Sequence, residues 1–319
     1  MDSPLLKVER LRVDYEQGRL SQRNRLTAVR DVSFTLAVGD TLGIVGESGC
    51  GKTTLGRAVL GLEKAKDGTV AYKGRLYTAM SRAEHQTARQ EMGLIFQDST
   101  GALNPRKTVL ETVAAPLKYR GVSREERSGR AKEALSAAGL FEEDWYQYPY
   151  ALSGGQRQRV CIARAMVGVP QLLVCDEAVS ALDGVLRRQI LELLAGLQHR
   201  TGAALLFISH DLRAVEEVCR QTAVMYLGRF VEFGATKTLF RKPKHPYTKA
   251  LLESVLRPDP SVPAPRPLQG EPPSPENPPA GCPFHPRCPV ALGKCRHVLP
   301  ELRCTGEGVL AACHRLEKA

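Results

Sequence analysis

The stretch Gly46-Glu47-Ser48-Gly49-Cys50-Gly51-Lys52-Thr53 fits the pattern G-x-x-x-x-G-K-[ST] at every fixed position. Residues 41–45 before it read as a short buried strand, and the residues from Thr54 to position 60 read as the first turns of a helix. In this context the glycines let backbone N–H groups turn toward phosphates, while the helix N-terminus and Lys52 supply positive charge. Thr53 is then available to hold Mg²⁺. Residues 46–54 are therefore the candidate nucleotide-binding loop.

The composition is that of a globular chain. A length of 319 residues allows about two domains, and 43% hydrophobic residues can form a sizeable core. No apolar run approaches the ~20 residues that span a bilayer, and the N-terminal residues lack an apolar signal core, so we expect a cytoplasmic protein without transmembrane segments. The formal charge of +11 is compatible with nucleic acid, an anionic membrane surface or polyphosphate as partner.

Three further apolar runs end on polar side chains. Residues 92–96 lead to Gln97, residues 172–175 lead to Asp176 and Glu177, and residues 203–209 lead to His210. The ends of parallel strands share one edge of the sheet with the phosphate loop, so these side chains are expected to meet there. Adjacent strand residues face opposite sides, so one carboxylate should orient Mg²⁺ and the other polarise the attacking water. A carboxamide such as that of Gln97 can contact both the Mg²⁺ ion and the attacking water.

Residues 98–150 have the pattern of an inserted helical segment. It closes at Leu152-Ser153-Gly154-Gly155-Gln156, where Ser153 is a plausible N-cap of the helix that follows. Two glycines and a serine at a helix start favour an anion. Because the chain already has a phosphate loop, this second motif suggests a second nucleotide held between two copies. Asp183 is expected to cap the helix over residues 184–198.

Two features near the N-terminus allow alternative interpretations. Tyr15 could stack its ring on adenine, or it could cover the core at the end of a strand. The basic loop that contains Arg19, Arg23, Arg25 and Arg30 is either solvated charge or a patch that faces a membrane or a subunit.

Taken together, these motifs resemble, in their order, the ATPase subunits of ATP-binding-cassette transporters. The carriers of the resemblance are Gly46 to Thr53, Gln97, Leu152 to Gln156, Asp176-Glu177, Ser180-Ala181-Leu182-Asp183 and His210. The resemblance covers residues 6 to 255, and the L-S-G-G-Q element separates this family from kinases and GTPases. It implies an α/β phosphate-loop NTPase fold of the ABC type: a RecA-like core, an antiparallel β edge, an α-helical subdomain and a small Cys-rich C-terminal segment. The expected domains are the ATP-binding core (1–97 and 157–256), the helical subdomain (98–156), a Pro-rich linker (257–281) and the tail (282–319).

A narrower resemblance follows from Phe96 to Arg106, Met225 to Arg229 and His245-Pro246-Tyr247-Thr248. These stretches look like the dipeptide and oligopeptide importer ATPases, most of all the F-type ATP-binding subunits of dipeptide permeases. The resemblance implies peripheral attachment to the cytoplasmic face of the cell's inner membrane, a second homologous ATPase subunit, two transmembrane permease subunits and, indirectly, an extracytoplasmic peptide-binding protein. Nucleic acid is not an expected partner.

The same resemblance implies roles for the motif residues. Lys52 and the loop amides hold the phosphates of ATP, while Thr53, Gln97 and Asp176 serve Mg²⁺. Glu177 is the general base and His210 braces the γ-phosphate. Ser153, Gly154, Gly155 and Gln156, with Asp183, complete the partner's nucleotide site. The sequence departs from the family pattern at Ala178, where proline is usual.

Two other functions compete with peptide import. A soluble ABC-type ATPase that acts on nucleic acid is suggested only by the charge. A regulatory nucleotide-binding subunit without turnover is disfavoured by the presence of both Glu177 and His210.

The tail contains five of the nine cysteines. They lack the close C-x-x-C pairs that are usual at zinc sites, so their spacing leaves open a metal site, unligated thiols or redox pairing. The importer resemblance, carried by Gly281 to Pro289 and Ala312-Cys313, implies a 4Fe-4S cluster. Its expected ligands are Cys282, Cys288, Cys295 and Cys313.

Overall fold

The computed structural model of the protein describes residues 3–17, 24–180, 182–254 and 270–318. Arg19 and Arg23 of the basic loop, Ala181, and residues 257–269 of the predicted linker lie outside the described residues. The chain divides into two compact units, each built from separate stretches of sequence. The first consists of residues 1–6, 35–41 and 71–209, and the second of residues 7–34, 42–70 and 210–319.

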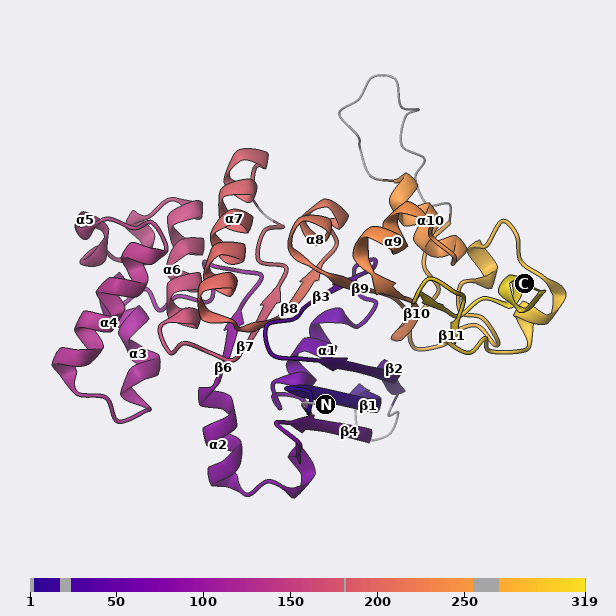
Figure 1. Ribbon diagram of the computed structural model, residues 1–319, viewed down its shortest axis with the longest axis horizontal. Helices are drawn as coiled ribbons and strands as arrows, with labels where there is room; N and C mark the ends of the chain where they lie inside the picture. The colour runs from indigo at the N-terminus through magenta and orange to yellow at the C-terminus, as the bar shows by residue number, and fades with distance from the viewer. Residues whose placement is uncertain (1–2, 18–23, 181, 255–269, 319) are drawn as a thin grey trace. The chain divides into compact units, whose positions relative to one another are not determined.

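The first unit contains a parallel sheet and a group of helices (Figure 1). Its strands β6 (Met92–Ile95), β7 (Leu172–Asp176) and β8 (Ala204–Ser209) are parallel neighbours with β7 in the middle. All residues of β7 and β8 are buried, which explains their uninterrupted apolar sequences. The remaining elements are β5 (Arg75–Leu76), η1 (Tyr77–Ala79), α2 (Arg82–Gln90), α3 (Val109–Lys118), α4 (Arg124–Ala137), α5 (Glu142–Trp145), η2 (Pro149–Ala151), α6 (Gly154–Met166) and α7 (Gly184–Thr201).

Helices α3, α4 and α6 pack around a hydrophobic core of their own, as their adjacent ribbons in Figure 1 indicate. Val113, Leu135 and Val160 are fully buried in this core, one from each helix. Thr108 and Ser123 cap the starts of α3 and α4 by accepting backbone hydrogen bonds, as local sequence rules predict. The exact bounds of the predicted helical subdomain stay a prediction.

The second unit contains strands of two sheets together with short helices. In one sheet β3 (Thr41–Val45) pairs parallel with β9 (Gln221–Tyr226), which pairs antiparallel with β10 (Arg229–Ala235). The other sheet has the order β2 (Asn24–Leu36), β1 (Leu6–Gln17), β4 (Asp67–Tyr72). The helical elements are α1 (Lys52–Val59), α8 (Leu212–Val218), α9 (Thr236–Arg241), α10 (Pro246–Glu253), η3 (His285–Arg287), η4 (Gly293–Arg296) and η5 (His314–Lys318).

The C-terminal residues join this second unit through the sheet. Strand β12 (Leu310–Ala311) pairs antiparallel with β10, and β11 (Arg303–Cys304) pairs with β12. The backbone N–H of Ala312 also donates to the carbonyl of Val231. The predicted separate Cys-rich segment is therefore not confirmed, because its strands extend the sheet of the nucleotide-binding unit.

Within the described ranges, no helix combines the length and apolar character that crossing a membrane requires.

Candidate active site

The predicted phosphate loop lies between β3 and α1 in the second unit. At two of its glycines a side chain would clash with backbone atoms of neighbouring strands. Gly51 caps α1 with φ +104°, and a Cβ atom there would lie 2.1 Å from the carbonyl oxygen of Ala28. Gly46 has φ +155°, and its Cβ would lie 2.2 Å from the carbonyl oxygen of Met225. The loop can follow this path only because both positions lack a side chain.

Lys52 is held inside the loop. Its side chain is buried, and its Nζ donates to the carbonyls of Gly46 (2.8 Å) and Glu47 (2.9 Å). The adjacent Cys50 thiol is also buried, and burial raises its pKa, so it remains neutral. The ammonium therefore supplies the positive charge of the loop. Backbone donors at the start of a helix beside a fixed cation form a cradle that suits a triphosphate.

Tyr15 lies half-buried at the far end of β1, where its hydroxyl is 3.4 Å from Oγ1 of Thr54. Burial raises the pKa of this phenol. The contact places the Tyr15 hydroxyl beside the first turn of α1. Stacking on adenine stays a prediction.

In the first unit, the structure brings Gln97 and Glu177 together. Nε2 of Gln97 donates to Oε2 of Glu177 at 3.1 Å, although 80 residues separate them. Asp176 ends β7 and is 8% exposed. Parallel pairing of β6 and β7 explains the contact, because both side chains follow the carboxyl ends of neighbouring strands.

The backbone at Glu177 is strained. Its φ is +50°, a left-handed conformation that is rare for residues other than glycine. The conformation is held by hydrogen bonds from its N–H to the carbonyl of Ile208 (2.9 Å) and from Ser180 Oγ to its own carbonyl (3.0 Å). Such strain concentrates at functional sites. That Glu177 and Asp176 direct their carboxylates to different tasks stays a prediction.

His210 and Asp183 follow the ends of other core elements. His210 comes directly after β8 and is exposed. Asp183 caps α7, as predicted, by accepting from the N–H of Leu186 at 2.9 Å. The loop and His210 belong to the second unit, and Gln97, Asp176 and Glu177 to the first. Their union in one site therefore stays a prediction.

The L-S-G-G-Q element starts α6 with a capping box. Ser153 Oγ accepts from the N–H of Gln156 (3.2 Å), and Gln156 Oε1 accepts from the N–H of Ser153 (2.9 Å). Gln156 Nε2 also donates to Asp144 (2.9 Å), a contact that the sequence did not suggest. Ser153 and Gly154 are exposed, whereas Gly155 is buried against Leu186, whose methyl carbons would lie 2.7 Å from an added Cβ. The exposed part of the element is thus accessible to a second molecule.

The predicted iron–sulfur site is wrong. Cys282, Cys288, Cys295 and Cys313 line one small hollow together with Phe284 and His314. Yet among the residues with described positions, no group of three or more His, Cys, Asp or Glu side chains is arranged to hold a metal ion. Burial raises the pKa of Cys282 to about 11 and also raises those of Cys288 and Cys313. Cys282 and Cys295 are buried, Cys288 and Cys313 are partly buried, and Cys304 is exposed on β11.

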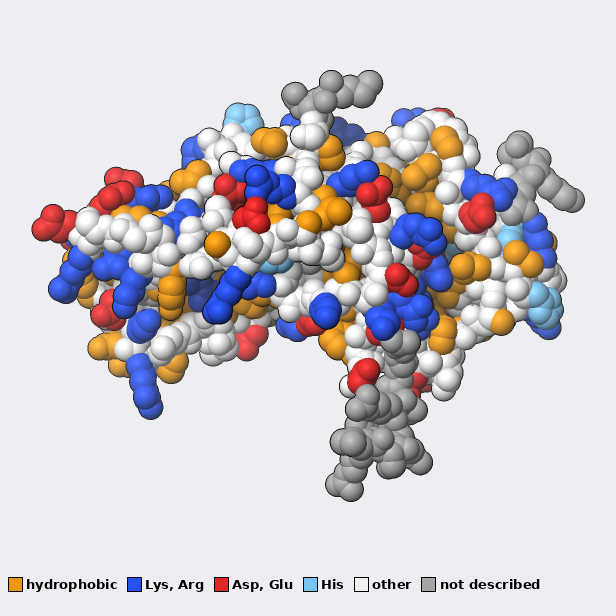
Figure 2. Space-filling model, turned by 90° about the horizontal axis from the view of Figure 1, so that it is seen from below, with side chains coloured by type: hydrophobic (Ala, Val, Ile, Leu, Met, Phe, Trp, Pro, Cys, Tyr) orange, Lys and Arg blue, Asp and Glu red, His pale blue; other side chains and the backbone are white. Residues whose placement is uncertain are grey.

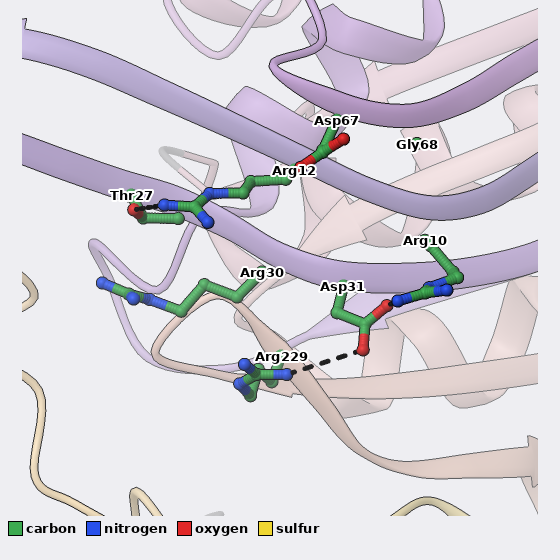
Figure 3. A pocket seen from close by; sticks show the side chains of 8 residues that line it. All are labelled: Arg10, Arg12, Thr27, Arg30, Asp31, Asp67, Gly68 and Arg229. Carbon is green, nitrogen blue, oxygen red and sulfur yellow. Dashed lines mark hydrogen bonds and ion pairs between the residues drawn. The ribbon is translucent and has the colours of Figure 1, made fainter.

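Arg30 of the predicted basic loop lines a separate open hollow of about 440 Å³ on the strands of the second unit (Figure 3). Asp31 lies between Arg10 (3.6 Å) and Arg229 (4.0 Å) and partly neutralises the hollow. Arg30 itself donates to the carbonyl of Pro275 at 2.9 Å, and burial lowers its pKa. Arg30 is therefore part of the folded unit rather than a freely solvated charge.

The fold and the loop define a phosphate-loop ATPase, and comparison with known proteins places it more closely. The family model "ABC transporter" matches residues 29–180, and the model "Oligopeptide/dipeptide transporter, C-terminal region" matches residues 231–295. The probable peptide ABC transporter ATP-binding protein y4tS of Sinorhizobium fredii is 46% identical, over 98% of this chain and 90% of its own length. The oligopeptide transport ATP-binding protein OppF of Salmonella typhimurium is 42% identical, over 93% of this chain and 92% of its own length.

Solved structures of ABC cassettes resemble the fold of this chain. The post-hydrolysis dimer of the ATP-binding cassette MJ0796, bound to ADP and Pi, has a TM-score of 0.66 and 28% identity, and covers 72% of this chain and 98% of that one. CbiO1 of Clostridium perfringens, part of the ABC transporter complex cbiONQ, has a TM-score of 0.66 and 28% identity, and covers 75% of this chain and 91% of that one. The chain belongs to the ABC transporter ATPases, in the group of the oligopeptide and dipeptide ATP-binding proteins. The predicted ABC-type nucleotide-binding fold and the predicted family are thereby confirmed.

Proposed function

We propose that this chain hydrolyses ATP to drive the import of peptides through a pair of transmembrane subunits. The observation that carries the proposal is the strained Glu177, held by Gln97 at the ends of neighbouring strands. A carboxylate fixed in this way suits a general base, as an ABC ATPase requires. The names of the relatives y4tS and OppF support peptides as cargo.

The phosphates of ATP lie against Lys52 and the amides of the loop. Thr53 and Asp176, with Gln97, would hold Mg²⁺, which neutralises phosphate charge when bound. Glu177 accepts a proton from a water molecule while the oxygen of that water forms a bond to the γ-phosphorus. The bond from that phosphorus to the β-bridging oxygen breaks, which yields ADP and phosphate. Gln97 keeps the carboxylate in place, and His210 supports the γ-phosphate.

The second half of each site comes from another ATPase subunit. Ser153 and Gly154 stand exposed at the start of the 13-residue helix α6, so they are free to contact a neighbour's nucleotide. The dimeric, ADP- and Pi-bound state of MJ0796 supports this arrangement. Hydrolysis then depends on closure of two subunits around shared ATP.

The helical part of the first unit is the proposed contact with the membrane subunits. Three aromatic residues are exposed on this part: Phe141 (71%), Tyr146 (55%) and Tyr150 (76%). Exposed aromatic side chains are enriched at protein interfaces. In this proposal the chain works at the inner face of the cell membrane, and an extracytoplasmic binding protein, an indirect partner, hands the peptides over for uptake. The predicted domain bounds, with a C-terminal segment that follows the Pro-rich linker, belong to the same proposal.

The nucleic-acid alternative has no support among the relatives, which are transporter ATPases. Figure 2 shows basic side chains interspersed with acidic and hydrophobic ones on the visible face, rather than the continuous basic stripe that nucleic acid favours.

Replacement of Glu177 by Gln tests the proposal. The carboxamide keeps the shape but cannot accept a proton, so ATP turnover should fall by about 10²–10⁴-fold, while ATP binding persists. Glu192→Gln is the matched control, because Glu192 lies exposed on α7, where it forms an ion pair with Arg188. Peptide uptake by vesicles that contain the partner subunits should fall in parallel. Retained turnover in Glu177→Gln would contradict the assigned base, and uptake of no peptide by the active wild type would contradict the cargo.

A further inference from the structure

Glu47, the second residue of the phosphate loop, is a junction between the loop and the C-terminal region. Three of its groups are engaged by three different segments. Its carbonyl accepts from Lys52 Nζ, its N–H donates to the Tyr247 hydroxyl at 2.9 Å, and its carboxylate faces Arg287. The most distant of these partners, Arg287, lies 240 residues from Glu47 in the chain. All of them belong to the second unit.

The contact with Arg287 is bidentate. Nη1 and Nη2 of Arg287 donate to the two carboxylate oxygens of Glu47 at 2.6 and 3.0 Å. The Arg287 side chain is only 4% exposed, and that of Glu47 is 25% exposed. Burial alone would lower the pKa of Arg287, but the hydrogen bonds and charge of Glu47 outweigh it and raise the pKa. A planar guanidinium that binds both oxygens fixes direction as well as distance.

Aromatic packing holds the partners of Glu47 in place. The rings of Tyr226, Tyr247 and Phe284 are in mutual contact, with centroids 4.6 to 5.4 Å apart. All three side chains are almost completely buried. Phe284 lies three residues before Arg287, so the same short turn η3 supplies both the ring and the cation.

The start of α10 is fixed independently. Glu232 of β10 is fully buried and accepts from the N–H groups of Lys244 (2.7 Å) and His245 (2.9 Å). The ring of His245 then accepts from the N–H of Tyr247 at 3.1 Å and caps the helix. Tyr247 therefore reaches Glu47 from a rigid support rather than from a loose loop.

We infer that Arg287 and Tyr247 are positioning residues for the phosphate loop, through which the C-terminal region sets the affinity for ATP. Both lie within residues 231–295, which match the C-terminal region of oligopeptide and dipeptide transporters. They act on Glu47, whose carbonyl in turn holds the ammonium of Lys52. The inference rests on the proposed function, because it assigns this region a role in binding the same ATP.

The test is a double-mutant cycle on the full-length chain, with Arg287→Ala, Glu47→Gln and the double variant. Binding of a fluorescent ATP analogue is measured together with the Tm. Arg287→Ala should weaken binding by about tenfold, the low end of what a hydrogen bond to a charged group contributes. In the Glu47→Gln background, Arg287→Ala should cause little further loss of ATP affinity, since Arg287 acts through the carboxylate of Glu47. Tyr247→Phe removes only the hydroxyl and should weaken binding while the ring packing persists.

Arg296→Ala is the matched control, because Arg296 is an exposed arginine of the same tail. In hydrolysis assays the positioning role raises KM and leaves kcat near the wild-type value, and Arg287→Lys should restore part of the affinity. The inference would be overturned if Arg287→Ala left ATP binding unchanged. It would also be overturned if Arg287→Ala reduced the affinity as much in the Glu47→Gln background as in the wild type. A wild-type chain that binds no ATP would overturn the proposed function itself, so the two failures are distinguishable.

Discussion

Substitution of Gly51 by Ala tests whether backbone crowding shapes the phosphate loop. Gly51 has φ +104°, a conformation that costs an L-residue about 1–3 kcal/mol. The added Cβ would also lie 2.1 Å from the carbonyl oxygen of Ala28 and 3.1 Å from Cε of Met225. Ordinary C···O contacts are about 3.3 Å or longer, so the loop and β2 would have to separate by roughly 1 Å. A backbone carbonyl cannot rotate away as a side chain does.

The expected result is a loss of nucleotide affinity. If the conformational cost alone is expressed on binding, the Kd rises by about 5- to 150-fold, at 1.4 kcal/mol per decade, and the clash adds to it. The assay is titration with a fluorescent ATP analogue, with the thermal midpoint measured on the same samples.

Gly74→Ala is the matched control. Gly74 has φ +76°, but nothing lies within 4 Å of its added Cβ. It should lose about 1–2 kcal/mol of stability and keep the wild-type Kd. Wild-type ATP affinity in Gly51→Ala would refute the crowding argument, and an equal loss in Gly74→Ala would attribute the effect to general destabilisation.

Two further predictions concern a helix cap and a buried histidine. Ser153→Ala removes the capping box of α6 and should cost about 1 kcal/mol of stability; the cap variant Ser123→Ala in α4 should match that cost, yet only Ser153→Ala should reduce ATP turnover. Burial lowers the pKa of His245 to about 3. Below pH 6.5 the unfolded chain therefore binds a proton that the folded chain does not bind. As the pH is lowered from 6.5 to 3, the free energy of unfolding should decrease by up to about 1.4 kcal/mol per pH unit. Urea unfolding at pH 7.0 and 5.5 should show a smaller decrease in His245→Asn than in the wild type, and equal decreases would contradict the assignment.

Local sequence determined much of this protein. The pattern from Gly46 to Thr53 specifies a strand, a glycine loop and a helix start, because each fixed residue answers a requirement of backbone geometry or charge within eight positions. The caps at Ser153 and Asp183 were predictable for the same reason, since a cap bonds to residues two or three positions away. The order of these motifs also sufficed to predict the ABC family.

Tertiary structure decided the contacts between distant segments. The hydrogen bond of Gln97 to Glu177 depends on which strands pair, and the ion pair of Arg287 with Glu47 depends on where a turn 240 residues away packs. The cysteines show the converse, because the family resemblance predicted an iron–sulfur cluster, whereas no group of side chains among the described residues is arranged to hold a metal ion. Spacing along the chain limits which residues can approach one another, but only packing of the whole chain sets the direction in which each side chain points.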